Sequence, residues 1–119
     1  MRPSLDIETV ERDGTVILVV AGEIDLATAP LFEEKLIAAE ATEAAAVIVD
    51  LERVSFMDST GLKVLVTHAL SEANGDRVHV TPGSAQVRRL FELTGVLERV
   101  SFVSPAAGPA PPNPPRDGI

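Results

Sequence analysis

The 119-residue chain is long enough for one domain with its own hydrophobic core, and its hydrophobic content of 45% includes four aromatic residues, all Phe. The absence of Cys excludes disulfides, zinc thiolate sites and thiol catalysis. A formal net charge of -8 without a basic stripe argues against direct binding of nucleic acid. Because no apolar run could span a membrane and the N-terminus lacks a signal peptide's apolar core, we expect a cytoplasmic protein with no membrane association.

Residues 5–21 predict a β-hairpin whose first strand lies at the edge of the sheet. Apolar and polar residues alternate at its start, the Asp-Gly pair at residues 13–14 supplies a turn, and residues 15–21 are rich in β-branched side chains. The sequence Gly-Glu-Ile-Asp at residues 22–25 is expected to break the second strand.

Three later segments have the periodicity of amphipathic helices. The first begins at Thr28 and Pro30, which are typical of a cap and first turn. The second covers residues 62–70 and is expected to end near the Asn-Gly pair at residues 74–75. The third closes at residues 94–95. The expected inward-facing residues are Phe32, Leu36 and Ala39 in the first helix, Leu62, Leu65, Val66, Ala69 and Leu70 in the second, and Val87, Leu90 and Phe91 in the third.

Further apolar segments between and after these helices predict strands. Residues 46–51 lack alternation, as expected of a central strand covered on both faces, while residues 77–80 and 100–103 predict a short and a final strand. Strands alternating with helices after an opening hairpin predict an α/β fold: a mixed sheet, mainly parallel with an antiparallel N-terminal edge strand, packed by helices. We assign residues 1–104 to this domain and the Pro-rich residues 105–119 to a disordered tail.

The candidate functional site is the turn between the central strand and the second helix, Asp58, Ser59, Thr60 and Gly61. Such a turn lies at the carboxyl end of a parallel strand, where ligands and partners bind, and the N-terminus of a helix can accommodate a phosphate. The alternative is that Ser59 and Thr60 merely cap the helix. The preceding acidic residue, and a glycine that would let a partner approach closely, favour a functional turn. If the second and third strands are neighbours, the loop containing Asp25 lies beside it.

An enzymatic role for the serine has little support. His68 lies in the same helix, about 13 Å further along its axis, too far to take a proton from Ser59. Met57 stands where the first glycine of a Gly-x-Ser-x-Gly elbow belongs. An aspartic-protease arrangement would require Asp25 to share a proton with Asp58 in a much larger cleft. We therefore expect a protein that is not an enzyme, binds no cofactor or metal, and receives a phosphate.

Four segments, in this order, resemble the STAS-domain anti-sigma factor antagonists of bacteria: residues 22–29 (GEIDLATA), 49–51 (VDL), 56–62 (FMDSTGL) and 87–95 (VRRLFELTG). The resemblance runs from about residue 5 to residue 103. It implies that the unphosphorylated protein captures an anti-sigma factor, which is also a serine kinase, and thereby frees a sigma factor. Phosphorylation by that kinase breaks the capture, and a partner serine phosphatase reverses the modification.

The same resemblance assigns roles to the site residues. It makes Ser59 the phosphoacceptor, gives Asp58 and Gly61 the role of shaping its turn, and places Asp25 in the neighbouring binding loop. Thr60 stands where the family often has another serine, so a second acceptor there stays open. The alternative function is a STAS interaction module that binds partners in a signalling or transport assembly without phosphorylation. The acceptor serine favours the switch, because an interaction module does not need a hydroxyl at this position.

Overall fold

A computed structural model of the chain describes residues 4–104. Within them, a four-stranded sheet has the order β1 (Leu5–Arg12), β2 (Thr15–Ile24), β3 (Ala46–Met57) and β4 (Val78–Val80). β1 pairs antiparallel with β2, whereas β2 with β3 and β3 with β4 are parallel. The predicted mixed sheet, mainly parallel with an antiparallel N-terminal edge strand, is confirmed. The disordered tail expected at residues 105–119 lies outside the described residues.

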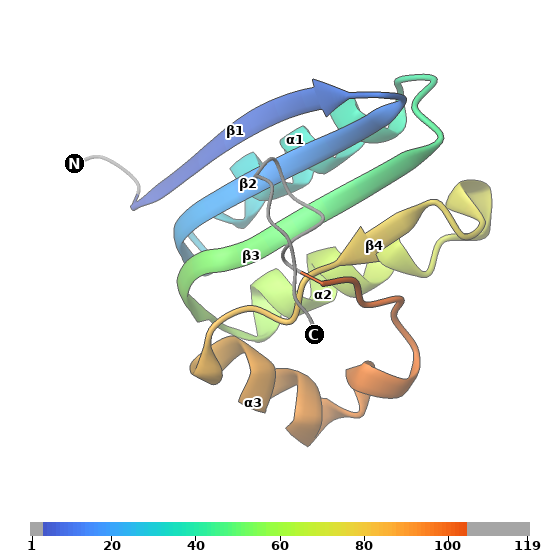
Figure 1. The fold of residues 1–119 in the computed structure, drawn as a ribbon. Helices are drawn as coiled ribbons and strands as arrows, with labels where there is room; N and C mark the ends of the chain where they lie inside the picture. Colours follow the sequence, from blue (N-terminus) through green and yellow to red (C-terminus); the bar gives the residue numbers. More distant parts are fainter. Residues whose placement is uncertain (1–3, 105–119) are drawn as a thin grey trace, which may run out of the picture.

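The α-helices of the described region are α1 (Ala29–Glu40), α2 (Ser59–Ala69) and α3 (Ala85–Thr94). Figure 1 shows α1 and α2 together on one face of the sheet, with α3 on the β4 side and its first turn near the end of β3. Short 3-10 turns at Glu72–Asn74 and Val96–Glu98 follow α2 and α3. No helix in residues 4–104 combines the length and the apolar character needed to cross a bilayer.

The core lies between the sheet and its helices, where the predicted apolar faces of the helices pack against the strands. The fully or nearly fully buried members of the three predicted helix stripes are Phe32, Leu36, Ala39, Leu62, Leu65, Ala69, Val87 and Phe91. Val66, Leu70 and Leu90 pack against this cluster while half-buried. In β3 the successive residues 47–49 are all buried, as the lack of alternation there predicts. Aliphatic side chains thus supply most of the packing, as expected from the composition.

The two central strands extend further than the sequence predicts. β2 continues through residues 22–24, with an irregular register between Gly22 and Glu23, and β3 runs on to Met57. Gly22 has a φ of +110°, and a Cβ atom there would lie 2.0 Å from the carbonyl oxygen of Ser4. That oxygen accepts a hydrogen bond from the Glu23 N–H at 2.8 Å. The glycine therefore lets β2 continue through a bulge while the backbone of Ser4 packs closely against it.

Two other predicted boundaries are wrong. α2 ends at Ala69, short of the Asn-Gly pair, because Ser71 starts a separate 3-10 turn and its hydroxyl accepts a backbone hydrogen bond within it. Residues 100–103 form no strand; Phe102 makes a single parallel bridge to Val80. β4 has three residues, which gives a further strand little length to pair with.

Candidate functional site

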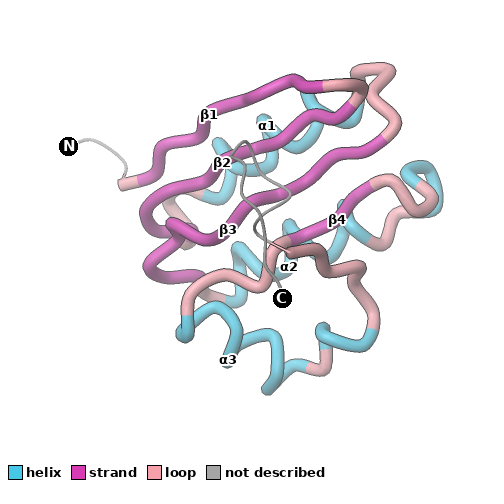
Figure 2. The backbone as a smooth tube through the Cα atoms, viewed as in Figure 1, coloured by secondary structure: helices cyan, strands magenta, loops and turns pink. Residues whose placement is uncertain are grey.

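The turns after β2 and β3 lie side by side. Ile24 and Met57, the last residues of the two strands, are partners in the parallel register, and the Asp58 N–H donates to the Ile24 carbonyl oxygen at 3.1 Å. Figure 2 shows both strands ending at the same edge of the sheet. The Asp25 loop and the Ser59 turn therefore lie next to each other, as predicted.

Asp58 is the N-cap of α2. Its Oδ1 accepts hydrogen bonds from the backbone N–H of Thr60 at 2.9 Å and of Gly61 at 3.1 Å. The alternative in which Ser59 and Thr60 cap the helix is therefore wrong, because the carboxylate one residue earlier does so. Because these two N–H groups are bonded to Asp58, they are not free to hold the phosphate that a helix N-terminus is expected to accommodate.

Ser59 is the first residue of α2 and is exposed, whereas Thr60 is half-buried. Among the residues that the structure describes, none forms a hydrogen bond with the Ser59 hydroxyl. Lys63, one helical turn further on, is exposed. The turn thus presents one accessible hydroxyl next to a carboxylate that is engaged in holding the helix.

Gly61 faces the interior of the protein. The residue is buried, and a Cβ atom there would lie 2.6 Å from Cγ2 of Ile24 and 3.1 Å from Cγ of Met57. Glycine at this position lets the first turn of α2 approach the ends of β2 and β3. The close approach that it permits is between parts of this chain, and not the approach of a partner that the sequence led us to expect.

Asp25 holds its own turn in the same way. Its Oδ1 accepts from the backbone N–H of Ala27 at 3.0 Å and of Thr28 at 3.1 Å. The buried Thr28 hydroxyl accepts from the Asp25 N–H and donates to the Glu23 carbonyl oxygen. Thr28 is the N-cap residue predicted for α1, but its side chain makes no cap hydrogen bond because it points back to the strand. Each of the two neighbouring strands therefore leads into a turn fixed by an aspartate.

Sequence reasoning missed two exposed apolar side chains at this end of the sheet. Leu26, directly after Asp25, is 76% exposed, and Phe56, two residues before Asp58, is 40% exposed. Their signal in the sequence was an apolar residue inside a turn and another near the end of a strand. Exposed apolar side chains that form a patch rimmed by polar groups are typical of a surface that binds another protein.

His68 is far from the first turn of α2 and links α1 with α2 instead. Its Nε2 lies 3.0 Å from Oε2 of Glu33 and its Nδ1 lies 2.7 Å from Oε2 of Glu40, both in α1. Burial lowers the pKa of His68, but the hydrogen bonds and charges of Glu33 and Glu40 outweigh burial, so the pKa is raised above 6.5. The expectation that His68 does not serve Ser59 as a base agrees with this placement.

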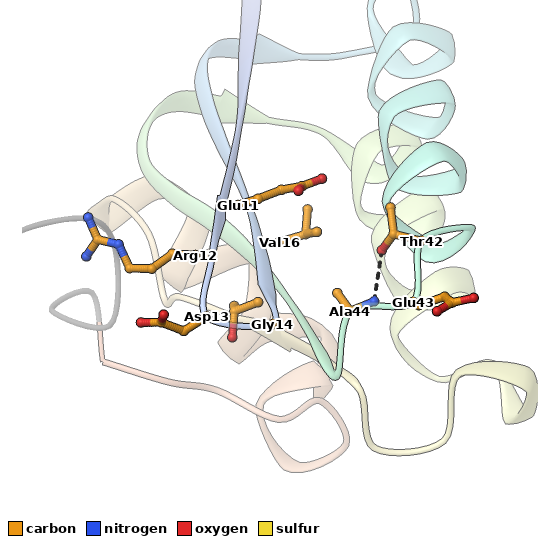
Figure 3. Close-up of a pocket in the computed structure, with 9 residues that line it drawn as sticks. Glu11, Arg12, Asp13, Gly14, Val16, Thr42, Glu43 and Ala44 are labelled. Atoms are coloured by element: carbon orange, nitrogen blue, oxygen red, sulfur yellow. Dashed lines mark hydrogen bonds between the residues drawn. The ribbon is translucent and has the colours of Figure 1, made fainter.

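A surface cavity of about 410 Å³ lies at the opposite end of the sheet, between the β1–β2 turn and the loop after α1. Figure 3 shows Arg12 and Asp13 directed to one side and Glu43 to the other, with a hydrogen bond from the Ala44 N–H to the Thr42 hydroxyl. Its charged groups do not converge as those of a ligand site do. Within the described part of the chain, no group of three or more His, Asp or Glu side chains could hold a metal ion.

Comparison with known proteins places this arrangement in a family. The STAS domain model matches residues 6–107. An anti-sigma-B factor antagonist of Staphylococcus aureus is 37% identical over 96 residues, which are 80% of this chain and 89% of that protein. The chain belongs to the family of STAS-domain anti-sigma factor antagonists. The resemblance identified from the sequence is therefore confirmed.

Solved structures show the same fold for this STAS domain. An anti-sigma factor antagonist from Mycobacterium paratuberculosis has a TM-score of 0.76 at 30% identity, covering 83% of this chain and 85% of that chain. The Bacillus cell fate determinant SpoIIAA in its phosphorylated form has a TM-score of 0.60 at 26% identity, covering 84% of this chain and 91% of that chain. A mixed sheet packed by helices is thus the framework that carries the Ser59 turn.

Proposed function

We propose that this protein is an anti-sigma factor antagonist switched by phosphorylation of Ser59. The unphosphorylated form binds an anti-sigma factor that is also a serine kinase, and this frees the sigma factor in the cytoplasm. Phosphorylation of Ser59 ends the binding, and a serine phosphatase restores it. The observation that carries the proposal is the exposed Ser59 hydroxyl at the first position of α2, without a hydrogen-bond partner among the described residues.

The local electrostatics favour Ser59 as a switch. The Thr60 and Gly61 N–H groups are bonded to Asp58, so a phosphate on Ser59 would face outward beside that carboxylate. A phosphoserine carries about -1.5 to -2 charges at neutral pH. Two such anionic groups side by side would present strong negative charge to any partner that closes over the turn. Thr60 is the weaker candidate acceptor because it is half-buried.

The binding surface of the proposal is the end of the sheet that carries both aspartate turns. Asp25, Asp58, Ser59 and Thr60 supply polar contacts, and Gly61 contributes through the shape of the turn. The exposed Leu26 and Phe56 add apolar area beside them. A partner surface that matches this pattern combines an apolar patch with cationic or hydrogen-bond-donating groups.

Mass spectrometry after incubation with ATP and the anti-sigma factor kinase that copurifies with this protein tests the proposal. We expect one phosphate on Ser59, absent from Ser59→Ala and retained by Thr60→Ala, which is the matched control. Undiminished phosphate on Ser59→Ala would overturn the assignment of the acceptor. Stable binding of the kinase with no phosphate on any residue would identify the non-phosphorylated interaction module instead.

A further inference from the structure

Among residues 4–104, no strand lies on one side of the β3 end that leads into the Ser59 turn. β4 pairs only with residues 47–49 of β3, whereas β3 continues to Met57. Met57 itself is fully buried. A buried backbone N–H and C=O that lack partners would destabilise the strand end, so the groups on this side need another source of hydrogen bonds.

The side chain of Gln86 supplies them. Its Oε1 accepts from the Met57 N–H at 2.9 Å, and its Nε2 donates to the Met57 carbonyl oxygen at 3.1 Å. The primary amide thus replaces the donor and acceptor of an adjacent strand at one residue. Gln86 lies in the first turn of α3, which Figure 1 shows near the end of β3.

We propose that Gln86 is a positioning residue for phosphorylation, an inference that rests on the proposed role of Ser59. Met57 directly precedes Asp58, whose carboxylate caps α2, and Ser59 follows at once. The turn is held on one side by the bond from the Asp58 N–H to Ile24 and on the other side by Gln86. Both attachments keep the Asp58 cap in register with the N–H groups that it binds, and this fixes the direction of the Ser59 hydroxyl.

α3 has anchors that do not depend on the Gln86 side chain. Val87 and Phe91 are fully buried, the Ser84 hydroxyl accepts from the Val87 N–H, and Oε2 of Glu52 accepts from the Gly83 N–H at 2.9 Å. A substitution at Gln86 therefore removes the support of the Ser59 turn while leaving α3 packed. This separation makes the inference testable in a folded protein.

Amide hydrogen exchange of the full chain, without kinase, tests the structural half of the inference. Gln86→Leu removes both hydrogen bonds, and Gln86→Glu keeps only the acceptor for the Met57 N–H. We expect protection of the amides of Met57, Thr60 and Gly61 to fall about tenfold in Gln86→Leu, the size expected for lost hydrogen bonds, and less in Gln86→Glu. Arg89→Ala, an exposed substitution on the same helix, is the control and should match the wild type. Unchanged protection in Gln86→Leu overturns the inference.

Steady-state phosphorylation by the kinase, with both variants confirmed folded by their melting curves, tests the functional half. We expect kcat on Gln86→Leu to fall about tenfold and KM to change much less, because the Ser59 hydroxyl is misdirected while the Asp25 turn and the exposed Leu26 keep their places in the binding surface. A wild-type kcat for Gln86→Leu overturns the positioning role while the proposed switch stands. If wild-type protein gains no phosphate on Ser59, the proposed function fails, and with it the role of Gln86 in phosphorylation, even where the exchange result holds.

Discussion

The backbone N–H of Asp58 donates a hydrogen bond to the carbonyl oxygen of Ile24 at 3.1 Å. This bond joins the end of β3 to the end of β2, at the point where each strand passes into a turn fixed by an aspartate. The carboxylates of Asp25 and Asp58 each accept two backbone N–H groups of the turn that follows. The two turns therefore form one structural unit, and a change in either is expected to affect the surface that both present.

Removing the cap of α2 should destabilise the protein. Asp58→Ala deletes the acceptor for the Thr60 and Gly61 N–H groups, and loss of an N-cap costs about 1 kcal/mol. For a domain of this size that corresponds to a fall in melting temperature of roughly 4–8 °C. Asp58→Asn keeps a capping oxygen and should recover most of the loss. Thermal and urea unfolding measure both variants; an Asp58→Ala protein as stable as the wild type would show that the cap is dispensable.

Gly61→Ala should destabilise although alanine is the better helix former. The gain in helix propensity is about 1 kcal/mol, whereas an added methyl 2.6 Å from Cγ2 of Ile24 forces a shift in a packed core that costs typically about 1–3 kcal/mol. Combining Gly61→Ala with Ile24→Ala should give less than the sum of the two single effects, because the second substitution removes the atom that clashes. Additive free energies of unfolding would mean that the helix relaxes by another route.

The contrast between these two residues shows how much of the site the sequence could predict. Asp58 and Gly61 stand out in the sequence because an acid and a glycine flank a hydroxyl at a strand-to-helix boundary. Their contacts depend on where β2 and β3 end, and the bulge near Gly22 and the extension of β3 to Met57 are tertiary effects that local propensity does not encode. The same holds for Gln86, which reads as an ordinary exposed helix residue until the ends of β3 and α3 are placed together.

Fold class was more predictable than the boundaries of its elements. The alternating pattern of strands and helices predicts the mixed sheet, because the spacing of apolar residues shows whether each element is buried on one face or on two. The strand expected at residues 100–103 does not form, because its neighbour β4 has only three residues and offers a single bridge, from Val80 to Phe102. The length of β4 depends on its tertiary contacts, which the local sequence pattern does not show.

Stability should depend on pH through His68. Its pKa is raised in the folded protein, so the protonated form favours folding. This contribution is fully present below the ordinary value of 6.5 and is lost as pH rises through the folded pKa. The melting temperature of the wild type should therefore contain a component that falls as pH rises above 6.5.

His68→Gln should remove that component, whereas His79→Gln, a matched change at the other histidine, should retain it. Calorimetric melting curves of the three proteins across this pH range give the comparison. The same pH dependence in His68→Gln and wild type would mean that protonation of His68 beside Glu33 and Glu40 does not contribute to stability.

Phosphorylation of Ser59 should weaken kinase binding by local charge and leave the fold unaltered. A phosphate beside Asp58 adds about -1.5 to -2 charges that a closing interface must either desolvate or repel. A differential free energy of about 3 kcal/mol would lower the affinity roughly a hundredfold. Because Asp58 occupies the Thr60 and Gly61 N–H groups, the helix end has little capacity left to neutralise the added charge.

Titration calorimetry with the kinase measures the effect, and backbone NMR locates it. Ser59→Asp should weaken binding less than phosphorylation does, because it adds less charge, while Ser59→Ala should bind and not switch. Thr67→Asp places the same added charge on an exposed position of α2, about 12 Å along the helix from Ser59, and should bind as the wild type does. The loss caused by phosphate should shrink as salt concentration rises, since screening reduces repulsion at a partly exposed site. Equal affinities of the two forms, or chemical-shift changes spread through the whole sheet, would contradict a local electrostatic switch.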